Sequence, residues 1–255
     1  QRQSLTALGF VLDGKTAHVP SWRPDVLGEA DLVEEVARIA SLTKLQGKPL
    51  PRVLPGVPKP ILSPVQKREQ AARRAGAALG FHECVSYSFI DQAAAALFGA
   101  GSDATRLENP ISADMSHMRP DLLPGLLAAA QRNQARGFAD LALFEIGPVF
   151  SGGEPEEQGL QIAGLLIGRS APKDVHASDR DVDLFDAKAD ALSILGAIGA
   201  PAKTQIRRGA APWWHPGRHG QICLGPKKTL AVFGELHPKI LAAFDIKGPA
   251  VGFTI

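Results

Sequence analysis

The feature that most constrains the fold is a stretch of polar loop and amphipathic helix at residues 107–136. Asn109-Pro110 marks a turn, because proline disfavours helical angles for the residue before it. One apolar helical face then appears at the i, i+3, i+4 and i+7 spacing, formed by Leu123, Leu126, Leu127 and Ala130. The pattern therefore predicts a helix that buries one side against a core.

Local signals set the limits of this helix. Pro124 fits only in a first turn, so we expect the helix to begin near Asp121, a favourable N-cap residue. Gly137 supplies a stop signal. Residues 141–146 follow as an apolar strand candidate, before a Gly-Pro pair. The predicted order is loop, helix and strand.

Composition indicates a globular protein with a large domain, alone or accompanied by a small one. The 255 residues are 45% hydrophobic and 21% charged, and the net charge of +2 gives no support to a surface that coats nucleic acid. Cys84 and Cys223 lie in apolar runs and indicate buried thiols in a reducing compartment. No apolar run is long enough to span a membrane. Because the chain begins at Gln1 inside a helical pattern, we expect a piece of a longer protein.

A proline-rich segment divides the chain. Residues 1–48 form a small α/β domain, expected to be truncated at its N-terminus, with a hairpin at Asp13-Gly14 and a helix over residues 28–42. Val33, Val36, Ala37 and Ala40 are expected on the buried face of that helix. The linker at 49–62 is rich in proline. Residues 63–255 form the larger domain.

Four carboxylates gather in the small domain: Asp25, Asp31, Glu34 and Glu35. The last three share one helical sector, and Asp25 lies just upstream. Converging acids suit a hard cation such as Mg²⁺, which prefers oxygen ligands. The residues alone also support helix capping, with Asp31 as N-cap and Glu34 completing a capping box. Both readings stay open on spacing alone.

The larger domain has mixed helix and strand signals. Ser63 with Gln66 predicts a capped helix over 64–79, followed by a half-buried strand over 85–89. A strand at 160–167, a helix after residue 182, a hairpin at 221–235 and a last helix and strand complete the pattern. Residues 213–218, Trp-Trp-His-Pro-Gly-Arg, fit either a catalytic or phosphate-binding pair or a turn above packed tryptophans.

Several short sequence motifs together resemble the β-subunit of bacterial phenylalanyl-tRNA synthetase. They are ENPIS, MRPDLLPGLL and LFEIGPVF in the larger domain, with VPSWRPDV and ADLVEEVARI in the small one. The chain has Ala40-Ser41-Leu42 where the family usually continues with Gly-Tyr. The resemblance implies an α+β fold, with a class II synthetase-like antiparallel sheet and flanking helices. A small, winged-helix-like α/β domain would precede it.

The resemblance also implies a role. Asp25, Asp31, Glu34 and Glu35 match the family's magnesium-binding pattern, in which the α-subunit or water would complete the shell of a shared Mg²⁺. The whole enzyme would attach phenylalanine to its tRNA with ATP, as a cytoplasmic (αβ)₂ heterotetramer with no membrane association. The α-subunit would carry the chemistry, other parts of the enzyme would bind tRNA, and this segment would bind no ATP. We therefore expect a non-catalytic scaffold with no catalytic residues.

The missing motifs agree with that expectation. Arg119 precedes a helix instead of lying in the strand–loop–strand setting of an α-phosphate clamp. The late Gly-rich Glu-Arg motif is replaced by residues 234–238, Gly-Glu-Leu-His-Pro, and Walker, GxSxG and zinc motifs are absent. A free-standing nucleic-acid-binding protein would need a basic recognition helix, yet the helix at 28–42 is acidic. A ligase of the biotin-ligase kind would need a nucleotide-binding Gly-rich loop.

Overall fold

The structure, a computed structural model, describes residues 1–51, 61–171, 175, 180–209 and 211–255. The chain divides into two compact units, Gln1–Pro60 and Ile61–Ile255. Most of the proline-rich linker expected at 49–62 lies outside the described residues. No helix in the described part of the chain is long and apolar enough to cross a membrane.

The first unit packs two helices and a hairpin around a small core. Its elements are α1 (Arg2–Ala7), β1 (Val11–Asp13), β2 (Thr16–His18), α2 (Glu29–Ala40) and the short 3-10 helix η1 (Leu42–Lys44). The hairpin expected at Asp13-Gly14 is present, and Leu5, Phe10 and Val26 form the buried centre. The expected buried face of α2 is partly wrong, because Val33 is exposed whereas Glu35 is buried.

A seven-stranded sheet is the centre of the second unit. Its strands are β3 (His82–Glu83), β6 (Leu141–Phe150), β7 (Gln158–Ile167), β8 (Gln205–Arg207), β9 (Trp214–Leu224), β10 (Lys228–Leu236) and β11 (Ala250–Thr254). Their order is β3-β6-β7-β11-β10-β9-β8. All neighbours are antiparallel except β3 and β6, which pair in parallel at one edge.

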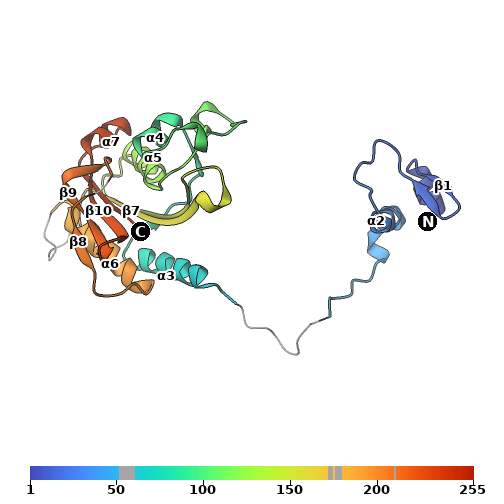
Figure 1. The fold of residues 1–255 in the computed structure, drawn as a ribbon, viewed down its shortest axis with the longest axis horizontal. Coiled ribbons are helices and arrows are strands. Elements are labelled where there is room, and N and C mark those ends of the chain that lie inside the picture. The colour runs from blue at the N-terminus through green and yellow to red at the C-terminus, as the bar shows by residue number, and fades with distance from the viewer. Residues whose placement is uncertain (52–60, 172–174, 176–179, 210) are drawn as a thin grey trace. The chain divides into compact units, whose positions relative to one another are not determined.

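Helices cover both faces of this sheet (Figure 1). They are α3 (Pro64–Ala78), α4 (Gln92–Leu97), α5 (Leu123–Gln134), α6 (Leu184–Ala197) and α7 (Pro238–Ala243). Strand residues alternate between the two resulting cores: Leu143 packs with the α5 side, and the next residue, Phe144, packs with the α3 and α6 side. The sheet therefore forms the middle of three layers, as the mixed α+β prediction requires.

Small elements fill the segment between α3 and α5. They are β4 (Phe89–Ile90) paired with β5 (His117–Met118), and the 3-10 turns η2 (Asp103–Thr105) and η3 (Ala113–Met115). A further turn, η4 (Pro155–Glu157), connects β6 and β7. These pieces place the loop that the sequence singled out beside the start of α5.

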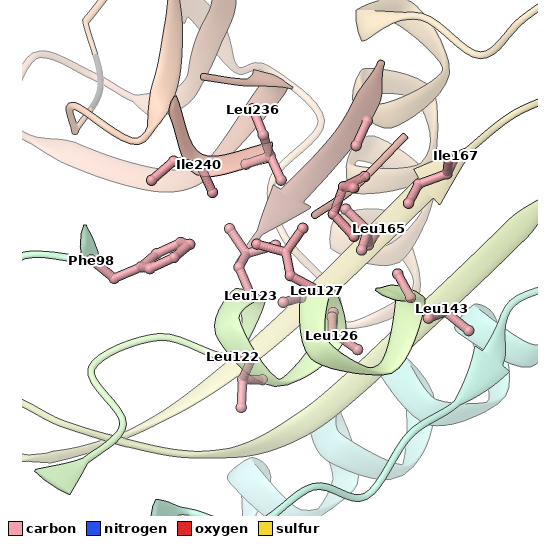
Figure 2. Close-up of a cluster of buried hydrophobic side chains, with 14 of the residues drawn as sticks. Phe98, Leu122, Leu123, Leu126, Leu127, Leu143, Leu165, Ile167, Leu236 and Ile240 are labelled. Atoms are coloured by element: carbon pink, nitrogen blue, oxygen red, sulfur yellow. The ribbon is translucent and has the colours of Figure 1, made fainter. Parts of the chain in front are cut away.

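The apolar stripe predicted for α5 forms the core on its side of the sheet (Figure 2). Leu123, Leu126 and Leu127 are fully buried against Leu165 of β7 and Leu236 of β10. Full burial of a leucine contributes roughly 1.5–3 kcal/mol, so this stripe is a large fraction of the unit's stability. The helix prediction is confirmed, with an end at Gln134 before Gly137.

Caps agree with the sequence in one helix and differ in another. At α3, the Ser63 hydroxyl accepts from the N–H of Gln66, and the Gln66 side chain accepts from the N–H of Ser63, as predicted. At α5 the N-cap residue is Leu122, not Asp121. The Asp121 carboxylate instead accepts from the N–H of Leu123 at 2.8 Å and from the Gln161 side chain at 3.2 Å.

One further expectation for this unit is wrong, and another is confirmed in part. The half-buried strand predicted over 85–89 is confined to Phe89 and Ile90, while Val85 and Tyr87 are exposed. The alternating pattern misleads because Ser86 bonds a buried carboxylate, Glu145, instead of a neighbouring strand. The packed tryptophans expected at residues 213–218 are confirmed, because Trp214 is buried in the core and Trp213 packs against it, although Trp214 begins β9 and pairs with Leu236.

Asp121 gives this fold a pH-dependent contribution. Burial raises its pKa from 3.8 to about 6, so the folded state holds the proton more tightly than the unfolded chain does. The stabilisation is therefore fully present below pH 3.8 and is lost as pH rises through about 6, with a total on the order of 3 kcal/mol.

Asp121→Asn should remove this component, because an amide does not titrate in this range. We expect the melting-temperature difference between variant and wild type to change between about pH 4 and 6.5 and then to level off. Exposed Asp13→Asn is the matched control. If the melting temperatures of wild type and Asp121→Asn change in parallel with pH across that range, Asp121 does not have a raised pKa in the folded state.

Candidate functional site

Arg23 connects two of the four acids that the sequence proposed as magnesium ligands. Its Nη2 donates to Asp25 at 2.7 Å, and its Nη1 donates to Glu35 at 2.8 Å. Arg38, one turn beyond Glu35 on α2, donates to the same carboxylate at 2.7 Å. These hydrogen bonds hold the pKa of Glu35 down at about 2, with the bond from Arg23 the largest cause.

The other two acids have different surroundings. The Asp31 carboxylate accepts from the backbone N–H groups of Leu27 and Gly28, each at 2.8 Å. Gly28 is the N-cap, three residues before the predicted position, and Asp31 at the third helical residue is its side-chain partner. Glu34 is exposed and makes no hydrogen bond or ion pair within the described part of the chain.

In this arrangement, protein groups are the hydrogen-bond partners of Asp25, Asp31 and Glu35. Among the described residues, no cluster of three or more His, Cys, Asp or Glu could hold a metal ion. The donor set does not fit a preformed magnesium site, because arginines neutralise Asp25 and Glu35 and backbone groups occupy Asp31. Sequence reasoning missed Arg23 and Arg38, although Arg38 stands at the i+3 position from Glu35, a spacing typical of helical ion pairs.

A buried ion pair lies where the central loop meets the sheet. Arg119 follows β5, and its side chain is 2% exposed. Its Nη1 donates to Glu145 of β6 at 2.7 Å and to the Ser86 hydroxyl at 3.0 Å, while its Nε donates to the carbonyl of Pro148 at 2.9 Å. Ser86 also donates to Glu145 at 2.7 Å.

The hydrogen bonds of Arg119 all go to groups of the protein. Its bonds go to a carboxylate, a hydroxyl and a backbone carbonyl, which are the groups that satisfy a buried guanidinium. Gly147 is required beside it, because a Cβ there would lie 2.5 Å from Arg119 Nη2. This cation therefore serves the fold and is not presented to a phosphate group.

A cavity of about 590 Å³ lies between residues 84–91 and α5, and Ser86 is among its lining residues. Val85, Tyr87 and Arg132 are among its lining residues. The side chains of Val85 and Tyr87 are 92% and 71% exposed. This exposed apolar segment, residues 85–87, is an unpartnered surface in the chain by itself.

Removing one partner of the buried pair should be costly. We expect Arg119→Met or Glu145→Met alone to lower the free energy of unfolding by about 3–5 kcal/mol, because each leaves an uncompensated buried charge. The double variant should be less destabilised than the sum of the two, measured by denaturant titration in a double-mutant cycle. Additive losses would contradict a coupled pair. Arg73→Met, in the half-exposed pairs with Glu69 and Glu83, is the matched control and should cost much less.

Comparison with known families covers both units. The family described as "Phenylalanyl tRNA synthetase beta chain CLM domain" matches residues 50–255. The family described as "tRNA synthetase B5 domain" matches residues 1–41.

Curated relatives are similar along the full chain. The phenylalanine–tRNA ligase beta subunit of Ruegeria pomeroyi is 73% identical over 255 residues, and that of Cereibacter sphaeroides is 70% identical over the same length. The corresponding protein of Rhodospirillum rubrum is 48% identical over 257 residues and covers 98% of the chain. The chain spans about a third, 32%, of the length of each of these relatives.

Solved structures share the fold at low identity. A structure of Desulfitobacterium hafniense PylSc, a pyrrolysyl tRNA synthetase, has a TM-score of 0.56 at 18% identity, covering 75% of this chain and 65% of that one. A second pyrrolysyl-tRNA synthetase structure from that organism has a TM-score of 0.56 at 15% identity, covering 94% and 80%. These neighbours bear out the class II synthetase-like fold. With the family match over most of its length, the chain belongs to the phenylalanyl-tRNA synthetase β-chain family.

Proposed function

We propose that the chain is the part of a phenylalanine–tRNA ligase β-subunit that assembles and positions the enzyme without performing its chemistry. The observation that carries this proposal is Arg119. The cation at the start of the central helix is buried and bonded to Glu145, Ser86 and Pro148. Phosphoryl chemistry needs cations directed at developing negative charge, and this one is directed inward.

In this proposal a partner α-subunit supplies the catalytic residues. The whole (αβ)₂ enzyme would use ATP to attach phenylalanine to its tRNA in the cytoplasm, and other parts of it would hold most of the tRNA. The relatives' description as beta subunits and their 70–73% identity support this assignment. At residues 234–238, Gly-Glu-Leu-His-Pro joins β10 to α7 where an adenylating enzyme would carry its second arginine.

The first test is amino-acid activation. We expect the chain by itself, and the full-length β-subunit by itself, to give no phenylalanine-dependent ATP–pyrophosphate exchange above a buffer blank. The same preparation should show exchange once the α-subunit is added, which is the control for folding. Exchange that scales with the β chain alone would overturn the scaffold proposal.

We further propose that residues 85–87, together with exposed residues of α3, form a contact surface for the α-subunit. Ala72 and Gly76 of α3 do not belong to this surface, because they are buried within the chain. A Cβ at Gly76 would lie 2.8 Å from the Phe144 ring, so this glycine permits packing on the sheet. The exposed apolar side chains Val85 and Tyr87 are left for a partner.

Charges in this surface should block assembly. We expect Val85→Asp with Tyr87→Asp to prevent co-elution of the β-subunit with the α-subunit in size-exclusion chromatography, because each carboxylate would be desolvated in the interface. Val11→Asp on β1 is the matched control, since Val11 is also a large exposed apolar residue. A double variant that still forms the complex would place the interface elsewhere.

The magnesium site at Asp25, Asp31, Glu34 and Glu35 stays a proposal, with the α-subunit or water completing the shell. Binding would require Asp25 and Glu35 to exchange arginine partners for the cation. A ligand that binds only the folded state raises the melting temperature by mass action. We expect millimolar Mg²⁺ to stabilise the wild-type complex, and Asp31→Asn or Glu35→Gln to abolish that rise.

Glu29→Gln, an exposed acid of the same helix, is the control and should keep the magnesium response. The capping account makes a different forecast: no magnesium response in any form, and little loss from Asp31→Asn, because its amide oxygen still accepts from the backbone. That outcome would remove the metal site and leave the acids as partners of arginines and backbone N–H groups.

A further inference from the structure

The His-Pro-Gly-Arg segment, residues 215–218, forms a large irregular bulge in β9. Between the pairs Gly234↔His219 and Leu236↔Trp214, β9 takes five steps while β10 takes two, so residues 215–218 loop out of the ladder. His219 Nδ1 donates to the carbonyl of His215 at 2.6 Å, and the N–H of Gly217 donates to His215 Nδ1 at 3.1 Å. These bonds fix the bulge, a feature that commonly directs side chains toward a functional surface.

The bulge contributes to the wall of a basic hollow of about 360 Å³. Its side chains come from α6, from the end of β8 and from the bulge: Phe185, Lys188, Arg207, Arg208, Arg218 and His219. Arg218 pairs with Glu235 at 2.6 Å, and Arg207 donates to the carbonyl of Pro226 at 2.9 Å. Within the described part of the chain, Lys188 and Arg208 have no hydrogen-bond or ion-pair partner.

His219 lies in the wall of this hollow, at the end of the bulge. Its Nε2 is buried and has no hydrogen-bond partner among the described residues. Because Nδ1 donates to a carbonyl, Nε2 of the neutral ring carries an acceptor lone pair. Because this atom is closed to solvent, His219 shapes the wall of the hollow and is not itself a contact for a ligand.

Exposed apolar side chains adjoin these polar groups. Phe185 is 65% exposed at the start of α6, and Ile206 is 48% exposed on the edge strand β8. Aromatic side chains beside basic ones are the usual platform for unstacked bases. The basic character continues outside the hollow, with exposed Lys203 before β8 and Lys227 in the β9–β10 turn that Arg207 holds. The surface therefore fits a chain of phosphates better than one isolated phosphate.

We propose that this basic hollow binds a single-stranded segment of RNA. Lys188 and Arg208 bind phosphates, and Phe185 stacks on a base. The inference rests on the proposed function only for its choice of tRNA as the natural source of the strand. Pyrophosphate exchange requires no tRNA, so it separates failure of this site from failure of the enzyme assignment.

The test uses the full-length β-subunit in its complex with the α-subunit, with the cognate tRNA as probe. Lys188→Ala with Arg208→Ala should weaken tRNA binding at least tenfold at about 0.1 M salt and leave pyrophosphate exchange unchanged. The slope of log affinity against log salt should fall by about 1.4, because two phosphate contacts on a single strand are lost. Lys15→Ala with Lys239→Ala, two exposed lysines elsewhere, is the charge-matched control and should change binding less than twofold.

A site-specific readout accompanies the affinities. A photoreactive phenylalanine analogue at position 185 should cross-link to the tRNA, and the same analogue at exposed Phe138 should not. A 12-nucleotide oligoriboadenylate should compete for the cross-link, and inorganic phosphate should compete far more weakly. Three results would overturn the proposal: no cross-link at 185, equal binding by the two double variants, or loss of α-subunit assembly in Lys188→Ala/Arg208→Ala.

Discussion

The buried pair between Arg119 and Glu145 is the constraint on which the larger unit depends. It joins three segments far apart in the sequence: the irregular chain around Ser86, the end of β5 and the middle of β6. Taking two charges out of water is costly, so the pair is tolerable only with all its hydrogen bonds made. The shapes of these segments, including Gly147 on β6, follow from that requirement.

The same constraint keeps the Arg119 guanidinium buried within the protein. The sheet lies between α5 on one face and α3 and α6 on the other, and the leucines of α5 fill the core on their side (Figure 2). Its central arginine is turned inward, and the neighbouring segment 85–87 is turned outward with apolar side chains exposed. A body of this kind is suited to holding a partner in position, which is the role proposed above.

The sequence predicted elements whose signals are local. The stripe of α5, the capping box of α3 and the Asp13-Gly14 hairpin all depend on residues within one or two turns of each other. It failed where distant polar groups decide the structure. Ser86 leaves the strand pattern because of Glu145, 59 positions away in the sequence, and no periodicity encodes that contact.

The four acids of the first unit illustrate the same limit. Two of them, Glu35 and Asp25, meet at one group, whereas Asp31 accepts from backbone N–H groups. That group is the guanidinium of Arg23, which a search for oxygen ligands alone does not consider. Residues 215–218 were likewise recognisable as an unusual sequence motif. That they form a bulge depends on the register between β9 and β10, which the sequence alone does not give. Pairings between distant charged groups and the register between strands are therefore known only from the structure.

The most direct test of the central claim replaces the buried pair with apolar residues of similar size. Arg119→Met with Glu145→Met removes both charges together, so the α–β complex should still assemble. If Arg119 serves only the fold, phenylalanylation of tRNA by the assembled complex should keep its kcat/KM within a few fold of wild type. A loss of about 10³-fold or more in a folded, assembled double variant would mean that Arg119 acts in the reaction and would contradict the account.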